Sequence, residues 1–192
     1  MPIRRESLLS LEAYARERNA FRARVIEHKK RRTVRLGEHL TLQFEDELTI
    51  RYQVQEMLRI ERIFEEEGIE GELDAYNPLV PDGTNWKATL LIEYPDPEER
   101  KRMLALLKGI EQALWVEVAG SPRVYAIADE DLERENEEKT SSVHFLRFEL
   151  DAPMRAAAAD GAAITLGVEH SHYRAKVELA AEVRTALCAD LR

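Results

Sequence analysis

The strand-like stretches of this chain come in runs, and this order limits the folds that the chain can adopt. Alternating or continuous apolar patterns occupy residues 86–94, 113–120, 123–129, 141–150 and 163–170. A parallel sheet needs a long crossover, usually a helix, between paired strands, and these stretches do not alternate strictly with helices. We therefore predict an α+β fold with a mostly antiparallel sheet of about five to six strands, packed by helices that include one long central helix.

Periodic apolar residues predict the longest helices. They recur at helical spacing over 8–31, over 47–68 and from about 175 to 191. Gly68 stands where a C-cap glycine is expected, so 47–68 is predicted to be the long central helix. With 192 residues, of which 44% are hydrophobic, the chain is expected to form a single globular domain over 1–192, in which the N-terminal helix packs as an arm.

Turn and capping residues predict the shorter elements. Asp96 occupies the N-cap position of a short helix that begins at Pro97 and ends before Gly109. Residues 35–46 alternate apolar and polar side chains, which predicts a strand or an extended arm. Two prolines and an Asp-Gly pair predict that 72–85 forms a loop.

Composition limits the classes of function. The formal net charge is −9, so general affinity for nucleic acid or for an anionic membrane is not expected, and the basic run at 22–35 fits a helix C-terminus. No apolar run is long enough to span a bilayer and no signal-peptide core follows the N-terminus, so a cytoplasmic protein is expected. Cys188 is the single cysteine, so a bound metal would have histidine and carboxylate ligands.

The predicted long helix carries polar side chains in its apolar stripe. Glu61 lies in the middle of the stripe that Ile50, Val54 and Phe64 define, and Gln53 lies at its edge. A buried carboxylate without a partner would be costly or would become protonated. Glu61 is therefore expected to face a cation, a hydrogen-bond donor or a metal.

Two histidines lie in phase with apolar strand residues. His144 alternates in register with Phe148, and His170 with Val168, so both rings are predicted to face a core. If their strands were neighbours beneath the long helix, these two histidines and Glu61 would converge. Two imidazoles and one carboxylate can hold iron, manganese or zinc and leave positions open for water or substrate.

A structural interpretation of the same residues stays open beside the metal hypothesis. In it, His144 is a hydrogen-bonded core histidine, His170 closes a strand, and Glu61 pairs with Arg147 or Arg59. The sequence has no HExxH, GxGxxG, GxxxxGK or GxSxG motif, so no catalytic role can be assigned from motifs.

Several segments, in order along nearly the whole chain, resemble the bacterial family called domain of unknown function 3501. They are LEAYARERNAFRARVIEHKKRRTVRLG, FEDELTIRYQVQEMLRIERI, ELDAYNPLVP, ATLLIEYPD, EEKTSSVHFLRFEL and VEHSHYRA. The resemblance implies a bacterial cytoplasmic protein without an established activity. Members are commonly encoded beside rubrerythrin-like and iron–sulfur oxidoreductase proteins, which implies a link to redox or peroxide-stress physiology.

The family pattern overlaps with the residues that periodicity selects. It is found at Gln55, Glu56, Met57, Arg59, Glu61, Arg62, Tyr76, Asn77, Glu138, Lys139, His144, Arg147, His170 and Tyr173. The chain departs from it in HSHY, where the family more often has a proline between His170 and Tyr173. His172 is therefore not expected to share a family role.

Two hypotheses of function follow. The first is a redox-linked or stress-linked accessory with an iron, manganese or zinc site at His144, His170 and Glu61. The second is a non-catalytic protein that binds a rubrerythrin-like or iron–sulfur oxidoreductase partner, with structural histidines. The side chains assigned to substrate or partner binding are Gln53, Glu56, Arg59, Tyr76, Asn77, Arg147 and Tyr173.

Overall fold

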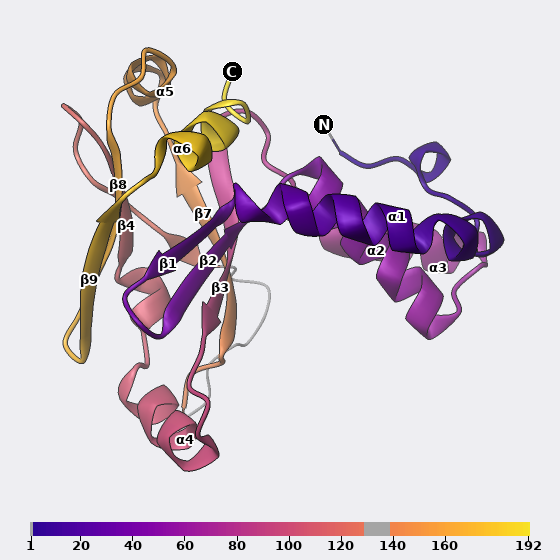
Figure 1. Ribbon diagram of the computed structural model, residues 1–192, viewed down its shortest axis with the longest axis horizontal. Coiled ribbons are helices and arrows are strands. Elements are labelled where there is room, and N and C mark those ends of the chain that lie inside the picture. The colour runs from indigo at the N-terminus through magenta and orange to yellow at the C-terminus, as the bar shows by residue number, and fades with distance from the viewer. Residues whose placement is uncertain (1, 129–138) are drawn as a thin grey trace.

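Two antiparallel sheets, with an arm of helices beside them, make up the computed structural model, which describes residues 2–128 and 139–192 (Figure 1). The first sheet has the order β1-β2-β3-β7-β6, with bounds Thr33–Leu36, Leu40–Phe44, Asn85–Ile92, Val143–Glu149 and Ile127–Ala128. The second has the order β5-β4-β8-β9, with bounds Val124–Tyr125, Leu114–Val118, Ile164–His170 and Tyr173–Glu178. The predicted α+β class and antiparallel pairing are confirmed.

The two sheets enclose one hydrophobic core. Leu90 of β3 and Phe148 of β7 belong to the same buried cluster as Val116 of β4 and Leu166 of β8. Burial alternates along β7, as expected for a strand with one face on a core and the other outside it. The sheets therefore form a sandwich.

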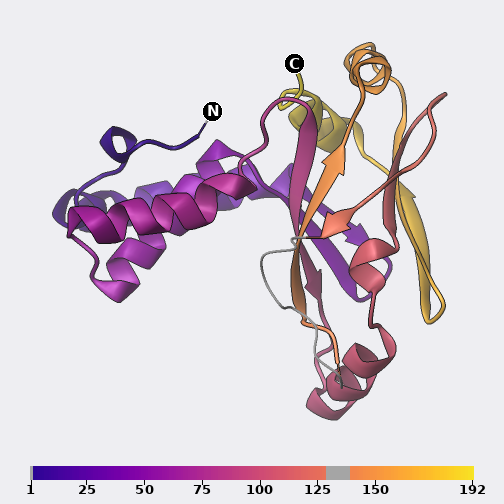
Figure 2. The same ribbon diagram turned by 180° about the vertical axis from the view of Figure 1, so that it is seen from behind.

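Three helices form an arm that extends sideways from the sandwich (Figures 1 and 2). Helix α1, Leu11–Lys30, runs toward the sandwich and is followed by β1. After β2, helix α2, Glu47–Glu61, runs away from the sandwich. Helix α3, Glu66–Tyr76, then returns toward β3. The arm has a second buried cluster, separate from that of the sandwich. Its members are Ile3, Leu8, Ile50, Val54, Leu58, Ile69, Leu73 and Val80.

The predicted helix over 47–68 is interrupted in the structure. Helix α2 ends because Arg62 adopts the left-handed conformation, with φ of 56°, and its N–H bonds to the Leu58 carbonyl. Ile63 then turns back to pack against the second cluster. Gly68 accordingly lies in the first turn of α3 and is not the C-cap of one long helix, and the predicted loop at 72–85 begins as part of α3.

The C-terminal segment also differs from its prediction. Residues Tyr173–Glu178 form β9, which pairs with β8, and only Ala181–Cys188 form helix α6. Side-chain burial alternates strictly along β9. The side chains of these six residues therefore alternate with a period of two, as in a strand, although the spacing of the apolar residues is also compatible with a helix.

The remaining helices are short. Helix α4, Pro97–Leu106, is capped by Asp96 as predicted, and helix α5, Ala152–Ala159, is capped by Asp151. The described residues also form three 3₁₀ turns, which are η1 at Arg5–Ser7, η2 at Asn77–Leu79 and η3 at Ile110–Gln112. Within residues 2–128 and 139–192, every helix is too short or too polar to cross a membrane.

Gly167 allows a close approach between β8 and the Trp115 side chain of its partner strand β4. A Cβ atom at this position would overlap with Cζ2 and Cε2 of the Trp115 ring, and Trp115 is itself buried. A side chain here would push the indole out of its place over the strand.

We predict that Gly167→Ala lowers the free energy of unfolding by about 1–3 kcal/mol, the usual cost of overpacking. Gly71→Ala is the matched control, because a Cβ there meets no atom within 4 Å and alanine favours the helix. Urea denaturation checks both variants. A Gly167→Ala protein as stable as the wild type would contradict the prediction.

Candidate functional site

The three side chains of the metal hypothesis lie on separate parts of the fold. His144 is on β7 of the first sheet, His170 ends β8 of the second, and Glu61 is an exposed residue at the end of α2. Strand β7 pairs with β3 and β6, so it is not a neighbour of β8. Among the described residues, no group of three or more histidine, cysteine, aspartate or glutamate side chains is placed to hold a metal.

His144 faces a core, as its register predicts, and is only 2% exposed. Its Nε2 atom lies 2.9 Å from Thr140 Oγ1 and 3.0 Å from the Ser141 carbonyl oxygen. Because a carbonyl oxygen only accepts, this geometry places the proton on Nε2. The contact ties the ring to the segment that leads into β7, which is the structural role considered for it.

His170 uses both ring nitrogens. Nε2 donates to the Lys108 carbonyl oxygen at 3.0 Å, and Nδ1 accepts from the His172 backbone N–H at 3.3 Å. The ring thus links the end of β8 to the segment after α4. This arrangement leaves no lone pair on the neutral ring for a metal.

The apolar stripe of α2 differs from the predicted one. Ile50, Val54 and Leu58 are buried, whereas Gln53 and Glu61 are exposed. Helix α2 ends at Glu61, so no further helical turn follows to cover this side chain. Neither side chain therefore faces the core, which corrects the prediction.

Glu56 is the centre of a polar network between α1 and α2. Its carboxylate accepts from Tyr14 Oη at 2.7 Å, from Arg18 at 2.7 and 2.8 Å, and from Arg59 Nη2 at 3.2 Å. The hydrogen bonds from Arg18, followed by those from Tyr14 and Arg59, outweigh burial and lower the pKa of Glu56 to about 2. Burial and the bond to Glu56 raise the pKa of Tyr14 above its usual range. The network fastens the two helices together.

Two amide side chains hold the N-terminal segment against the arm. Gln55 accepts from the Leu9 N–H at 2.6 Å and donates to the Leu9 carbonyl at 3.3 Å. Asn77 makes the same pair of bonds with Ile3, at 2.7 and 3.0 Å. Each amide thus replaces a backbone partner, and both side chains hold the N-terminal segment in place.

The other side chains assigned to binding also have contacts within the fold. Tyr173 Oη donates to the Leu36 carbonyl at 2.9 Å and accepts from the His39 N–H at 3.0 Å. Tyr76 packs against the second cluster, and Arg147 forms an ion pair with its neighbour Glu149. Glu138 of the family pattern lies outside the described residues.

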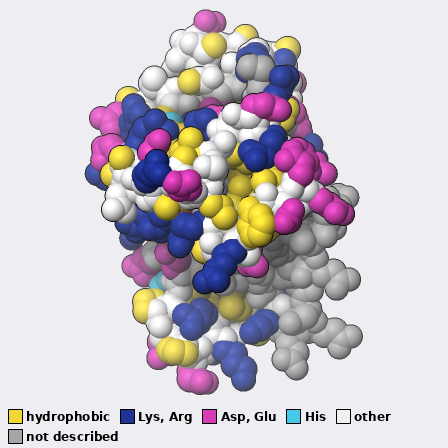
Figure 3. Space-filling view, turned by 90° about the vertical axis from the view of Figure 1, so that its right-hand side faces the viewer, with side chains coloured by type: hydrophobic (Ala, Val, Ile, Leu, Met, Phe, Trp, Pro, Cys, Tyr) yellow, Lys and Arg dark blue, Asp and Glu magenta, His cyan; other side chains and the backbone are white. Residues whose placement is uncertain are grey.

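Among the described residues, the most exposed large apolar side chains lie at the far end of the arm. Phe64, in the turn between α2 and α3, is 70% exposed, and Ile60 is 58% exposed. Figure 3 faces this end of the arm and shows hydrophobic side chains gathered between acidic and basic ones. We call Ile60 and Phe64 the tip pair.

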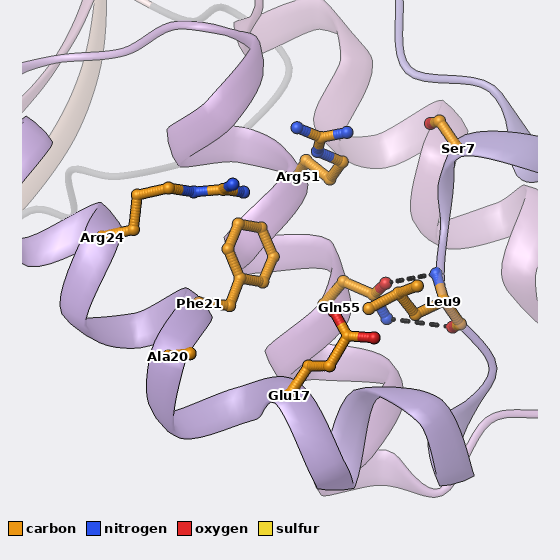
Figure 4. Close-up of a pocket in the computed structure, with 8 residues that line it drawn as sticks. All are labelled: Ser7, Leu9, Glu17, Ala20, Phe21, Arg24, Arg51 and Gln55. Carbon is orange, nitrogen blue, oxygen red and sulfur yellow. Dashed lines mark hydrogen bonds between the residues drawn. The ribbon is translucent and has the colours of Figure 1, made fainter.

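A pocket lies on the flank of the arm, between α1, α2 and the N-terminal segment (Figure 4). Phe21 and Arg24 come from α1, and Arg51 and Gln55 from α2. The cavity has a volume of ≈ 400 Å³ and is open to solvent. Its cationic side chains and aromatic ring make it a candidate for a ligand site.

Comparison with known proteins assigns the chain to a family. A family model described as Protein of unknown function (DUF3501) matches residues 2–191. The chain belongs to the DUF3501 family. A novel protein of unknown function from Burkholderia pseudomallei K96243, with a crystal structure at 1.90 Å resolution, is 55% identical. The match covers 100% of both chains with a TM-score of 0.95. No match was found among curated proteins.

Sequence reasoning on this DUF3501 chain missed the pocket and the tip pair. Arg24 was part of a basic run, and Arg51 is far from it in sequence, so only the packing of α1 on α2 brings them together. Phe64 fits the apolar stripe predicted from the sequence, and its exposure depends on the left-handed conformation of Arg62, two residues earlier. An arginine in that conformation has no sequence signal comparable to a C-cap glycine.

We predict that Glu56→Gln lowers the free energy of unfolding at pH 7 by about 2 kcal/mol, because the charged hydrogen bonds from Arg18 are lost. Glu56 has a folded-state pKa of about 2, below its ordinary 4.5. Its contribution is therefore complete above pH 4.5 and is lost as the pH falls through 2. The difference between wild type and variant should shrink across that window.

Urea denaturation at pH 7, 4 and 3 measures this difference. The control is Glu27→Gln, which removes the exposed ion pair between Glu27 and Lys30 and should leave stability near that of the wild type. A gap between wild type and Glu56→Gln that stays constant from pH 7 to pH 3 would show that the ionised carboxylate does not carry the effect.

Proposed function

We propose that this chain acts in the cytoplasm as a non-catalytic binding protein that docks a partner protein through the end of its helical arm. The exposure of the tip pair, Ile60 and Phe64, carries the proposal. Side chains of this size are among those that folding normally buries, and an exposed apolar patch rimmed by polar residues can mark an interaction surface. Phenylalanine is also enriched in the cores of protein interfaces.

The backbone presents the tip pair outward in a fixed way. Helix α2 begins at a complete capping box of Asp46 and Thr49, and its other end is set by the left-handed Arg62. Ile63, which lies between Arg62 and Phe64, packs against the second cluster. Phe64 is therefore held on an anchored turn and does not need to be ordered when a partner binds.

The charge around the tip pair indicates the chemistry of the partner. Glu61, Glu65, Glu66 and Glu67 are all exposed and adjoin the tip pair in sequence, and they outnumber the exposed cation Arg62 beside them. A partner surface with an apolar pocket and a rim of lysine or arginine would complement this arrangement. A second copy of the chain would present the same acidic residues, so we assign the contact to a different protein.

The family resemblance supplies the partner class. DUF3501 members are commonly encoded beside rubrerythrin-like and iron–sulfur oxidoreductase proteins, and we propose one of these as the partner. The chain would then be a redox-linked or stress-linked accessory. Its contribution would be to position or recruit the oxidoreductase, with chemistry left to the partner.

The metal hypothesis for His144, His170 and Glu61 stays a prediction from the sequence. Elemental analysis of protein purified under anaerobic conditions tests it beside the double variant His144→Ala, His170→Ala. Iron, manganese or zinc near one equivalent, lost in the double variant, would support it. No distance among the described residues favours it over partner binding.

We predict that Phe64→Ala weakens binding of the purified oxidoreductase partner by about tenfold or more, as expected for a buried aromatic anchor. Calorimetric titration with the rubrerythrin-like and iron–sulfur proteins, at low and high salt, provides the measurement. The matched control is Tyr125→Ala, an aromatic residue 48% exposed on the sandwich. Affinity should also fall with ionic strength because of the acidic rim.

Equal loss of affinity in the two variants, or no binding to either protein, would contradict the proposal. A concentration-dependent dimer that disappears in Phe64→Ala would assign the tip pair to self-association instead. Sedimentation of the isolated chain measures that outcome.

A further inference from the structure

We propose that the pocket on the flank of the arm binds small organic anions, with a carboxylate or phosphate group held by Arg24 and Arg51. The pocket does not include the tip pair, so this inference is independent of partner docking. The lining residues on which the inference depends are Glu17, Phe21, Arg24, Arg51 and Gln55.

Two arginines converge on one aromatic ring. The guanidinium carbon of Arg24 lies 4.9 Å from the centroid of the Phe21 ring, and that of Arg51 lies 5.9 Å from it. Figure 4 shows the two guanidinium groups on the same side of the ring. Two like charges beside one ring repel each other, and an oxyanion between them would be attracted by both.

The fold supplies no carboxylate that neutralises this pair in full. Within the described residues, the Arg24 guanidinium makes no ion pair or hydrogen bond, in contrast to those of Arg18 and Arg59, which share Glu56. Arg51 Nε is buried without a hydrogen bond, although Glu47 Oε1 lies 3.3 Å away outside hydrogen-bond geometry. Both guanidinium groups therefore keep donors for a ligand, and the planar fork of arginine matches carboxylate and phosphate oxygens.

The aromatic ring is held in position for an apolar ligand body. Tyr14 and Tyr52 make edge contacts with Phe21, with centroids at 6.0 and 5.8 Å. Gln55 beside it is fixed by its two hydrogen bonds to Leu9 (Figure 4). The walls next to the arginines are therefore set before a ligand arrives, which lowers the cost of binding.

Glu17 makes the pocket asymmetric. Its side chain lies on the opposite side of Phe21 from the two arginines, near Gln55 and Leu9 (Figure 4). A ligand with anionic groups at both ends would place one of them beside this carboxylate. The pocket therefore favours a ligand with one anionic end and an apolar body.

Titration with three probes tests the inference, with binding followed by calorimetry and by NMR shifts of the arm residues. Phenyl phosphate and benzoate combine an oxyanion with a ring, and inorganic phosphate has no ring. We expect phenyl phosphate or benzoate to bind, and the one that binds more tightly identifies the preferred oxyanion. Inorganic phosphate should bind about tenfold more weakly. Arg24→Ala and Arg51→Ala should each weaken probe binding about tenfold.

Arg22→Ala is the matched control, because it removes the same charge from an exposed position of α1 outside the pocket. Arg24→Lys and Arg51→Lys keep the charge without the fork and should bind in between. Circular dichroism confirms that each variant is folded. An equal loss of probe binding in Arg22→Ala, equal binding of inorganic and phenyl phosphate, or no binding by either aromatic probe would overturn the inference.

Discussion

The buried guanidinium of Arg32 joins the helical arm to the sandwich, and the arrangement of both parts depends on it. Arg32 is 2% exposed and follows the end of α1. It donates to the backbone carbonyls of Phe44, Glu45 and Ala186 at 3.1–3.2 Å, and it forms ion pairs with Asp46 and Asp190. An arginine has five N–H donors, and Arg32 makes four hydrogen bonds, to the three carbonyls and to Asp190, while Asp46 faces its Nη1 atom as an ion pair. A cation this deeply buried is tolerated only when it is so completely paired.

The partners of Arg32 fix where the arm begins. Asp46 is the N-cap of α2, and its carboxylate also lies 2.5 Å from His28 Nε2 near the end of α1. Burial would raise the pKa of Asp46, but Arg32, the Thr49 N–H and His28 outweigh it, so the carboxylate stays ionised. One carboxylate therefore caps the outgoing helix and holds the incoming one. The arm extends from the sandwich because this polar junction, and not a shared hydrophobic core, connects the two.

Local signals in the sequence predicted the elements whose ends are chemically marked. Asp96 with Pro97 predicted α4, and the alternation around His144 predicted β7 and its buried ring. The sequence could not show that His144 and His170 lie on different sheets, because strand register says nothing about which strands pair. Arg24 and Arg51 likewise lie on the same pocket only because α1 packs on α2, which is a contact between residues far apart in the sequence. The sequence thus predicted the fold class, the capped helix α4 and the burial of His144, but it placed Glu61 wrongly and did not predict the candidate site.

Residues of the family pattern mainly build the arm, and this bears on how the arm can function. Gln55 and Asn77 bind the N-terminal segment through paired amide hydrogen bonds, while Glu56 links α1 to α2. None of these side chains is at the tip pair, and only Gln55 contributes to the pocket, as a wall. Their effect on binding is indirect: a helix pair held by internal polar contacts presents Phe64 and the two arginines with little loss of entropy on association. Loosening the network at Glu56 should therefore weaken both kinds of binding without touching either ligand.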